Sequence, residues 1–442
     1  MTGAAATNEI LPDPRDRAST ASEPKLEPAN AIESVIFWAV ASTYPIWLVG
    51  GLYLVGSALG WLAGLLLLAR ILRSGRSPIP GTVWLWIVGI VAIAGTLFAS
   101  HADFHQSTGT LIKSLVSWAR TWALLPLYLL VGCLPIRPQI LYRAAGVVSA
   151  WTLALMPFLW GLKAIHFREI WYTSPLRVLG GPNAISFFQI GVYSAEDHGA
   201  GELRWKLFAP WSPALGLMGV FFFMFALQDK GKWRWIGIVG SLLMIGMSGS
   251  RMSLVSLPAV LIATWCLHNI RRPMVLVGAG IASALGGLGA DWAIAKFTSF
   301  YRAFKAARAG SSQVRSDLQK IAWFRFPEAP IWGHGMVDSG PITVAYMPIG
   351  SHHTWFGLLF VHGVVGLVAL LVPMVVTTLD LAWRSLSDPL AMTGLRLMLT
   401  LWLFSLGENI ESIAYFYWPA LVGIGMALCQ RSQVSSSAIG RA

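Results

Sequence analysis

The sequence predicts an all-α integral membrane protein with about twelve transmembrane helices and a large outer loop, containing short helices, before the tenth of them. Three observations support this fold class. Of the 442 residues, 55% are hydrophobic and only 12% are charged, roughly half the charged share of a typical soluble domain. The mean hydropathy is +0.62. Apolar stretches close to the bilayer-spanning length recur along the whole chain, so they do not describe one buried core.

The chain divides into a membrane domain and two tails. Residues 1–33 are rich in Ala, Pro, Glu and Asp without an apolar run, which favours a disordered cytoplasmic tail over a cleavable signal peptide. Residues 34–429 form the expected polytopic domain, and residues 430–442 form a second cytoplasmic tail. The expected spans are 34–50, 52–69, 82–99, 110–133, 141–161, 208–228, 235–249, 252–268, 274–290, 354–376, 394–407 and 413–429.

Basic residues recur in alternate connectors, and this pattern sets the expected orientation. They are Arg70, Arg73, Arg76, Arg137, Arg143, Lys230, Lys232, Arg234, Arg271, Arg272, Arg384, Arg396, Arg431 and Arg441. The positive-inside rule places such connectors, and with them both termini, in the cytoplasm. The rule also accounts for most of the net charge of +12, which no nucleic-acid-binding motif accompanies. Three Cys fall at these cytoplasmic ends, so no disulfide is expected: Cys133, Cys266 and Cys429.

Two long connectors are expected on the outer side, at 162–207 and 291–352. The second is basic, although the positive-inside rule disfavours positive charge there. Its residues 296–309 show an amphipathic helical pattern, which favours a helix lying on the membrane surface, with phosphate contact as an additional role. The loop is therefore either long enough to escape the charge rule or in contact with an anion.

Several arginines in or beside the expected spans are candidates for binding an anion. Arg251 lies in a short turn between two spans, where it either snorkels to the interface or clamps a lipid-linked phosphate. Arg315 lies in a predicted short helix beginning near Ser312 and, taken alone, resembles a solvated surface residue. Arg177 and Arg204, in the first outer loop, either bind an anion or flank a membrane helix.

Arg120 falls near the middle of the expected span 110–133. A charged residue at this depth is functional by default, but the sequence assigns it no specific role. An ion pair with Asp103 or Glu408 is an equally good interpretation.

His352 and His353 come directly before the expected span 354–376. An imidazole at this position suits proton transfer near neutral pH. The alternative is a histidine that caps the helix or lies at the interface, and for a single His this is the commoner case. His362, inside the span, is expected to pack or form a hydrogen bond, and Gly363 and Gly366 to allow close helix approach. The sequence contains no HExxH or comparable metal-ligand spacing.

Taken in order, three motifs resemble the O-antigen ligase and polymerase superfamily of membrane glycosyltransferases. They are Gly249-Ser-Arg251; Arg315 followed by Ala322-Trp and Pro330-Ile-Trp-Gly-His-Gly335; and Ser351-His-His-Thr-Trp-Phe with Gly363 and Gly366-Leu. The resemblance covers roughly 200–370 and implies a GT-C-like architecture. Each motif is weak alone, whereas their order, spacing and shared outer location make the set fairly specific.

The resemblance implies transfer of a glycan from an undecaprenyl-diphosphate carrier to an acceptor on the outer face of a bacterial inner membrane, without metal or cofactor. His352, eleven residues before Gly363, matches the family's histidine, with His353 as a rival because it stands where the family has Asn. Arg251 and Arg315 match diphosphate-binding arginines. The stretch from Arg204 to Pro213 is similar to the family's Arg and Pro-Asn segment, but more loosely, since Ala214 stands where Asn is common. Pro182-Asn183, which follows Arg177, is the alternative counterpart, so Arg204 and Arg177 are both tentative diphosphate-binding residues.

Several functions remain open at this stage. The acceptor is either another lipid-linked repeat unit, as in an exopolysaccharide or O-antigen polymerase, or lipid A core, as in a ligase, or a protein. The His-His-Thr-Trp version of the motif weakly favours a polymerase. A lipid-linked oligosaccharide flippase is a less favoured alternative, because no inverted repeat is visible. Expected partners are the bilayer, the lipid-linked glycan donor, the acceptor, and flippase and chain-length regulator proteins. The sequence does not define the sugar, the linkage or the oligomeric state.

Overall fold

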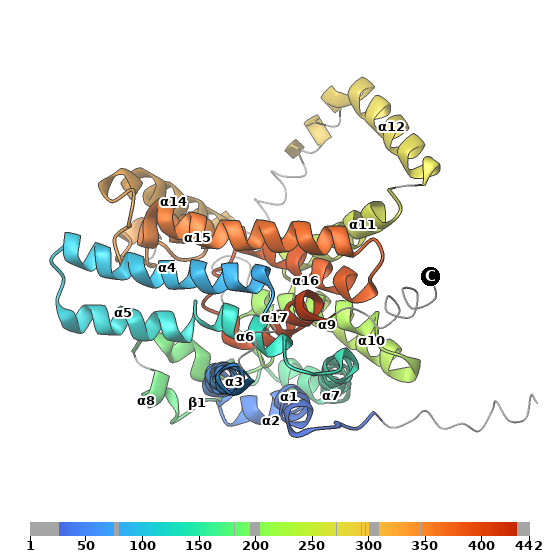
Figure 1. Ribbon diagram of the computed structural model, residues 1–442, viewed down its shortest axis with the longest axis horizontal. Helices are drawn as coiled ribbons and strands as arrows, with labels where there is room; N and C mark the ends of the chain where they lie inside the picture. Colours follow the sequence, from blue (N-terminus) through green and yellow to red (C-terminus); the bar gives the residue numbers. More distant parts are fainter. Residues whose placement is uncertain are drawn as a thin grey trace, which may run out of the picture.

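A computed structural model describes residues 26–74, 79–180, 182–194, 204–270, 272–292, 294–296, 298–299, 309–344 and 346–430. Within these ranges the chain is mostly helical with almost no strand (Figure 1). The helices are α1 (Ala31–Ala41), α2 (Thr43–Leu48), α3 (Leu52–Ser74), α4 (Gly81–Asp103), α5 (Thr108–Arg120), α6 (Leu124–Gly132), α7 (Pro138–Ala164), α8 (Arg177–Gly180), α9 (Ser212–Ala226), α10 (Gly231–Ser248), α11 (Arg251–His268), α12 (Pro273–Leu288), α14 (Ala309–Arg325), α15 (Thr354–Arg384), α16 (Pro389–Ser405) and α17 (Ala414–Cys429).

The remaining elements are short. Three 3₁₀ helices are η1 (Pro182–Phe188), η2 (Phe326–Glu328) and η3 (Ile342–Val344). In the first outer loop, β1 (Tyr172–Thr173) pairs antiparallel with β2 (Gln189–Ile190), and β3 (Tyr193–Ser194) pairs antiparallel with β4 (Arg204–Trp205). As predicted, the connector 291–352 carries helices, and α14 begins before Ser312 rather than at it. The outer side of both long connectors stays a prediction.

The chain is membrane-embedded, although its number of spans is only partly defined. Among the described residues, six helical segments are long and apolar enough to cross a bilayer: α3, α4, α5 with α6, α7, α11 and α15. The count becomes seven if α12 and the bent segment Ala290–Lys296 form one span. Shorter apolar helices, α1, α9, α16 and α17, occupy other expected spans. The count of about twelve therefore stays a prediction.

Helix α17 lies in the core of the bundle, with all but its last residue buried. It crosses α6 closely because a glycine stands on each helix at the contact. A Cβ on Gly132 would meet the backbone of Met426, and one on Gly425 would meet the carbonyl of Leu129. Such small-residue contacts let membrane helices approach without a hydrophobic driving force.

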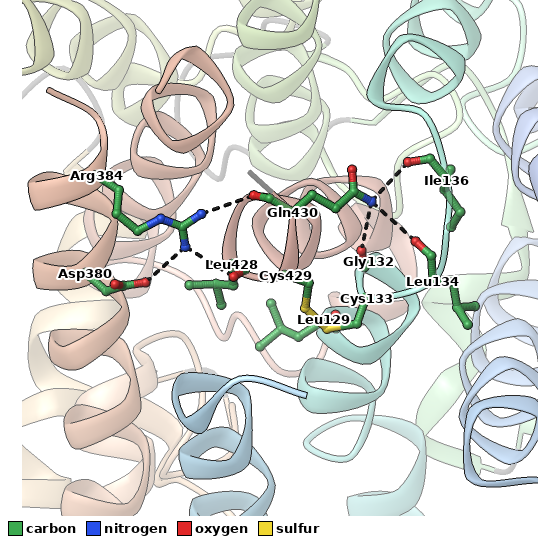
Figure 2. Close-up of a disulfide and its surroundings, with 10 residues drawn as sticks. All are labelled: Leu129, Gly132, Cys133, Leu134, Ile136, Asp380, Arg384, Leu428, Cys429 and Gln430. Atoms are coloured by element: carbon green, nitrogen blue, oxygen red, sulfur yellow. Dashed lines mark hydrogen bonds and ion pairs between the residues drawn. A yellow bond between two sulfur atoms is a disulfide. The ribbon is translucent and has the colours of Figure 1, made fainter. Parts of the chain in front are cut away.

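The connectors that carry Arg137, Arg143 and Arg384 lie at one end of the bundle, whereas Arg76, Arg271, Arg431 and Arg441 lie outside the described residues. Arg137 pairs with Glu33 at the start of α1 (2.7 Å), and Arg143 pairs with Asp229 between α9 and α10 (3.0 Å). Arg384, at the end of α15, donates to the carbonyl oxygen of Leu428 in the last turn of α17 and to that of Gln430 just after it (Figure 2). This common location is what the charge pattern predicts, while the side of the membrane on which it lies stays a prediction.

The expectation of no disulfide is wrong in this structure. Cys133, just after α6, is bonded to Cys429, the last residue of α17, at the same end of the bundle (Figure 2). Gln430 strengthens this junction by donating through Nε2 to the carbonyls of Leu134 and Ile136. The spacing of 296 residues hid the pairing, because a sequence pattern does not show which helix ends meet. Cys266 is a free thiol.

Helix α15 is broken at Gly363, whose φ of +63° and ψ of −163° are not helical. The loop segment 330–335 fills this break. The carbonyls of Phe360 and Val361 accept from His334 and Gly335, and Val364 donates to Pro330 (2.9 Å each). A break in a membrane helix is tolerated only where its backbone groups find other partners, and segment 330–335 supplies them.

Other expectations about α15 and its neighbours have mixed outcomes. His362 is buried and forms a hydrogen bond with Thr96 through Nδ1 (2.8 Å), as expected. Gly363 permits close approach of segment 330–335 rather than of another helix, because a Cβ there would meet the carbonyl oxygen of Ile331. Helix α12 stands away from the bundle, with no buried residue (Figure 1). The amphipathic pattern over 296–309 lies largely outside the described residues.

Candidate functional site

Five of the predicted site residues lie at the end of the bundle opposite the connectors of Arg137 and Arg384: Arg204, Arg251, Arg315, His352 and His353. Several segments far apart in the chain meet there: α14, the N-terminus of α15, strand β4, the turn between α10 and α11, and the loop 406–413 between α16 and α17. The connections that hold them together are hydrogen bonds rather than apolar packing alone.

Arg315 and Glu408 form the central pair of this site. The Arg315 guanidinium donates one bond to the carbonyl of Gly407 (2.9 Å) and another to Oε1 of Glu408 (3.1 Å). The second carboxylate oxygen of Glu408 accepts from the indole N–H of Trp211 (3.1 Å). Glu408 is buried, and burial raises the pKa of its carboxyl group, while Arg315 opposes that shift. Because a guanidinium has five N–H donors, Arg315 keeps others for a ligand.

Thr354 joins the start of α15 to the same loop. Its hydroxyl donates to the carbonyl of Glu408 (2.7 Å) and accepts from the backbone N–H of Ile410 (3.1 Å). The next residue of α15, Trp355, donates through its indole N–H to the hydroxyl of Ser405 (2.9 Å). The first turn of α15 is thereby fixed relative to Glu408, and the two histidines that precede it are fixed as well.

His352 presents an imidazole nitrogen suited to accepting a proton. Its Nδ1 lies 2.7 Å from the hydroxyl of Ser351, and that hydroxyl donates to the carbonyl of Pro348 (2.5 Å). Since the only hydroxyl proton of Ser351 is used, its oxygen accepts from Nδ1–H of His352. The hydrogen-bond network therefore assigns the proton to Nδ1 and leaves the lone pair on Nε2. The backbone of His352 has a φ of +65°, a conformation that few non-glycine residues adopt.

His353 has the opposite arrangement. It is the N-cap of α15, and its Nδ1 accepts from the backbone N–H of Trp355 (3.2 Å) and of Phe356 (3.5 Å). A neutral imidazole that accepts at Nδ1 carries its proton on Nε2. His353 thus occupies the capping role that the sequence left open for either histidine, and its ring has no free lone pair.

Both imidazoles are neutral at pH 7. Burial lowers the pKa of His352 and of His353 from 6.5 to about 4, and the positive charge of Arg315 adds to the effect. Arg315 is thus electrostatically coupled to both histidines as well as to Glu408.

Arg204 and Arg251 approach the same region from the first half of the chain. Arg204 donates to the carbonyl of Ser248 at the end of α10 (3.0 Å), and its positive charge opposes the rise in the pKa of Glu408 that burial causes. Arg251 is the first residue of α11, directly after the Ser250 N-cap. Its neighbour Met252 lies beside Gly407, where an added Cβ would be 3.3 Å from the methionine methyl group.

Arg177 and Arg120 have no contact with Arg315 among the described residues. Arg177 is exposed on α8. Arg120 ends α5, in a break within the expected span, and donates to the carbonyl of Gly180 (2.9 Å). The ion pair considered for Arg120 is therefore wrong for Glu408, whose carboxylate hydrogen bonds with Arg315 and Trp211.

Sequence reasoning did not identify the acidic loop as part of the site. The sequence suggested Glu408 only as an ion-pair partner for Arg120, and it assigned no role to Glu411. One carboxylate oxygen of Glu411 is buried without a hydrogen-bond partner among the described residues, and burial raises the pKa of this group to about 7. The available signal was two carboxylates within a short connector between apolar segments, where charged residues are rare.

A comparison with protein-family models identifies a family for the part of the chain that contains most of this site. Residues 236–371 match the model described as O-antigen ligase. This segment belongs to the O-antigen ligase and polymerase superfamily. The O-antigen ligase domain contains Arg251, Arg315, His352 and both sides of the break in α15, whereas Glu408 lies outside it. A search of curated proteins found no match. The family implies a glycosyltransferase-type enzyme acting on lipid-linked glycans in the bilayer.

Proposed function

We propose that the protein transfers a glycan from an undecaprenyl-diphosphate carrier to an acceptor hydroxyl, with His352 as the general base. The observation that carries this proposal is the hydrogen bond between His352 Nδ1 and Ser351, which leaves Nε2 able to accept a proton. His353 lacks this property because its Nδ1 caps α15.

In the proposed step, the acceptor oxygen attacks the anomeric carbon of the carrier-bound sugar. A new glycosidic bond forms, and the bond between the anomeric carbon and the diphosphate oxygen breaks. The hydroxyl proton passes to Nε2 of His352, and the electron pair of the broken bond leaves on the lipid diphosphate. A pKa of about 4 keeps His352 in the neutral form that accepts a proton, although it also makes the imidazole a weak base.

The leaving diphosphate requires positive charge, and the arginines supply it. Arg315 is held by Gly407 and Glu408 with N–H groups to spare, so its guanidinium is oriented before the donor binds. Arg251 and Arg204 would add charge from the α10–α11 turn and β4. Arg177 stays a weaker candidate, because it is exposed on α8.

The acceptor we favour is a second lipid-linked repeat unit, which makes the protein a polysaccharide polymerase. The His-His-Thr-Trp sequence at 352–355 is the basis for this preference. The basic end of the bundle would face the cytoplasm and His352 the periplasm, following the positive-inside rule. In that location, flippase and chain-length regulator proteins would be its partners.

The test is an in vitro assay with the purified chain and one undecaprenyl-diphosphate repeat unit as the only substrate. A ladder of longer lipid-linked chains on a gel is the expected result, and His352→Ala should lack it. Transfer that appears only after lipid A core is added would replace the polymerase by a ligase. Failure with both acceptors would overturn the proposal and favour a flippase. Transport of the same lipid across the membrane of proteoliposomes would then test that alternative.

A further inference from the structure

A partly open cavity lies at the basic end of the bundle, away from His352. Its volume is about 260 Å³, far above the roughly 10–15 Å³ that one water molecule needs. The cavity lies between the end of α11 and the start of α16, two helices that pack together. Its lining includes the side chains of Arg396, Thr264, Asn269 and Trp265.

Arg396 supplies a positive charge to the lining, and Asp388 supplies a negative one. The charge pattern assigned Arg396 to a connector, but α16 begins at Pro389, so Arg396 lies seven residues inside the helix, about 10 Å from its start. Its Nε donates to the hydroxyl of Thr264 (3.3 Å), whose own proton goes to the carbonyl of Val260. Within the described ranges, no carboxylate oxygen lies within 4.0 Å of its nitrogens.

A charged residue at this depth is costly unless it faces a polar cavity or a counter-charge. Arg396 faces such a cavity, and its Nη groups remain for a ligand after the bond to Thr264. The fork geometry of a guanidinium matches the oxygens of a phosphate group. Asp388 also lines the cavity, but its carboxylate caps α16 by accepting from Leu390 (2.8 Å). It lies about 12 Å further along the helix axis than Arg396.

The surroundings favour a phosphate that belongs to a lipid. Trp265 lines the cavity with more than half of its surface exposed, and Trp concentrates at the membrane–water interface. Basic pockets between membrane helices are a recurring site for lipid head groups. We therefore propose that this cavity binds a phosphate-bearing group, most simply a phospholipid head group, with Arg396 as its anchor. The proposal does not depend on glycan transfer at the His352 site, which lies at the opposite end of the bundle.

The test is native mass spectrometry of the purified full chain in detergent, titrated with phosphatidylglycerol or phosphatidylethanolamine. The wild-type chain should retain one phospholipid, and Arg396→Gln should bind it at least tenfold more weakly. Arg234→Gln is the matched control, since this exposed arginine on α10 lies at the same end but not in the cavity. Diacylglycerol, which lacks the phosphate, should not occupy the site.

Competition with inorganic phosphate then identifies the source of the ligand. A lipid that stays bound in excess phosphate shows a head-group site, and displacement shows a site for the phosphate group itself. Equal retention by Arg396→Gln and the wild type, or equal binding of diacylglycerol, would overturn the proposal. If Arg396→Gln does not fold, Thr264→Val tests the same point, because it removes the acceptor that orients the guanidinium. Its affinity should fall severalfold, and an unchanged affinity would count against the site.

Discussion

Arg315 on α14 and Glu408 in the α16–α17 loop form a 3.1 Å ion pair across 93 positions of sequence. The pair ties α14, which lies within the O-antigen ligase domain, to a loop beyond that domain. Its glutamate is buried and also accepts from Trp211. The pair therefore fixes an arginine that would otherwise lie on a surface helix.

Glu408→Ala should destabilise the protein by about 1–3 kcal/mol, because Arg315 and Trp211 would each lose an acceptor in a buried setting. Glu408→Gln should cost less, since its amide oxygen can still accept one of these bonds. Thermal unfolding in detergent measures both effects. Equal melting temperatures for Glu408→Ala and the wild type would show that the pair contributes nothing to stability.

His352→Ala should lower the initial rate of lipid-linked glycan formation by at least a hundredfold, the usual range for loss of a general base. His353→Asn should remain active, because Asn replaces one N-cap with another good one. Matching melting temperatures would establish that both variants are folded. The opposite result, an active His352→Ala with an inactive His353→Asn, would transfer the base to His353.

Arg251→Ala and Arg315→Ala should weaken use of the lipid-diphosphate donor, raising its KM as well as lowering kcat. Lys320→Ala provides the control, because this lysine lies on the same helix as Arg315 but is 70% exposed and paired with Asp317. Donor binding is measured with a non-reactive diphosphate lipid. Unchanged affinity in both arginine variants would rule out the diphosphate clamp.

Gly363→Ala should destabilise the protein by about 2 kcal/mol or more. The φ of +63° and ψ of −163° lie in a region that essentially only glycine adopts, at a cost of roughly 1–3 kcal/mol for another residue, and the new Cβ would also meet the carbonyl of Ile331. Gly95→Ala in α4 is the control, since a Cβ there meets nothing within 4 Å. Thermal unfolding and proteolysis of the outer loop report the change. Equal sensitivity of the two variants would contradict the backbone role of Gly363.

Glu411 should make the stability depend on pH. Burial raises the pKa of this carboxyl group from 4.5 to about 7, so the folded state holds a proton that the unfolded state releases. Its contribution to stability is therefore fully present below pH 4.5 and is lost as the pH rises through about 7. Glu411→Gln should remove this component from the melting curves. His352 and His353 act in the opposite direction between about pH 4 and 6.5, and the comparison of wild type with Glu411→Gln cancels them.

The sequence predicted helices where apolar stretches are long, and it placed Arg251, Arg315 and His352 at one end of the bundle. Those inferences rest on local composition and on the alternation of charged connectors, which insertion into a bilayer imposes directly. The sequence did not predict the pairing of Arg315 with Glu408 or of Cys133 with Cys429. Each joins helix ends whose proximity depends on the packing of the whole bundle.

The choice between His352 and His353 also required the structure. Both residues have the same side chain at the same helix mouth, and only the partner of each Nδ1 separates them. The break at Gly363 was likewise invisible, because the apolar pattern continues through it. A sequence records that Gly363 is a glycine but not that segment 330–335 supplies the hydrogen bonds missing there.

The way segment 330–335 completes α15 has a consequence for biogenesis. A helix with an open break cannot settle in the bilayer core, because unsatisfied peptide groups are expensive in hydrocarbon. The segment that closes the break precedes α15 in the chain and is therefore synthesised first. We therefore expect insertion of α15 and folding of the segment before it to be coupled. Deletions or tags within 330–335 would disturb the membrane helix itself, whereas the loop would otherwise look like a dispensable external insertion.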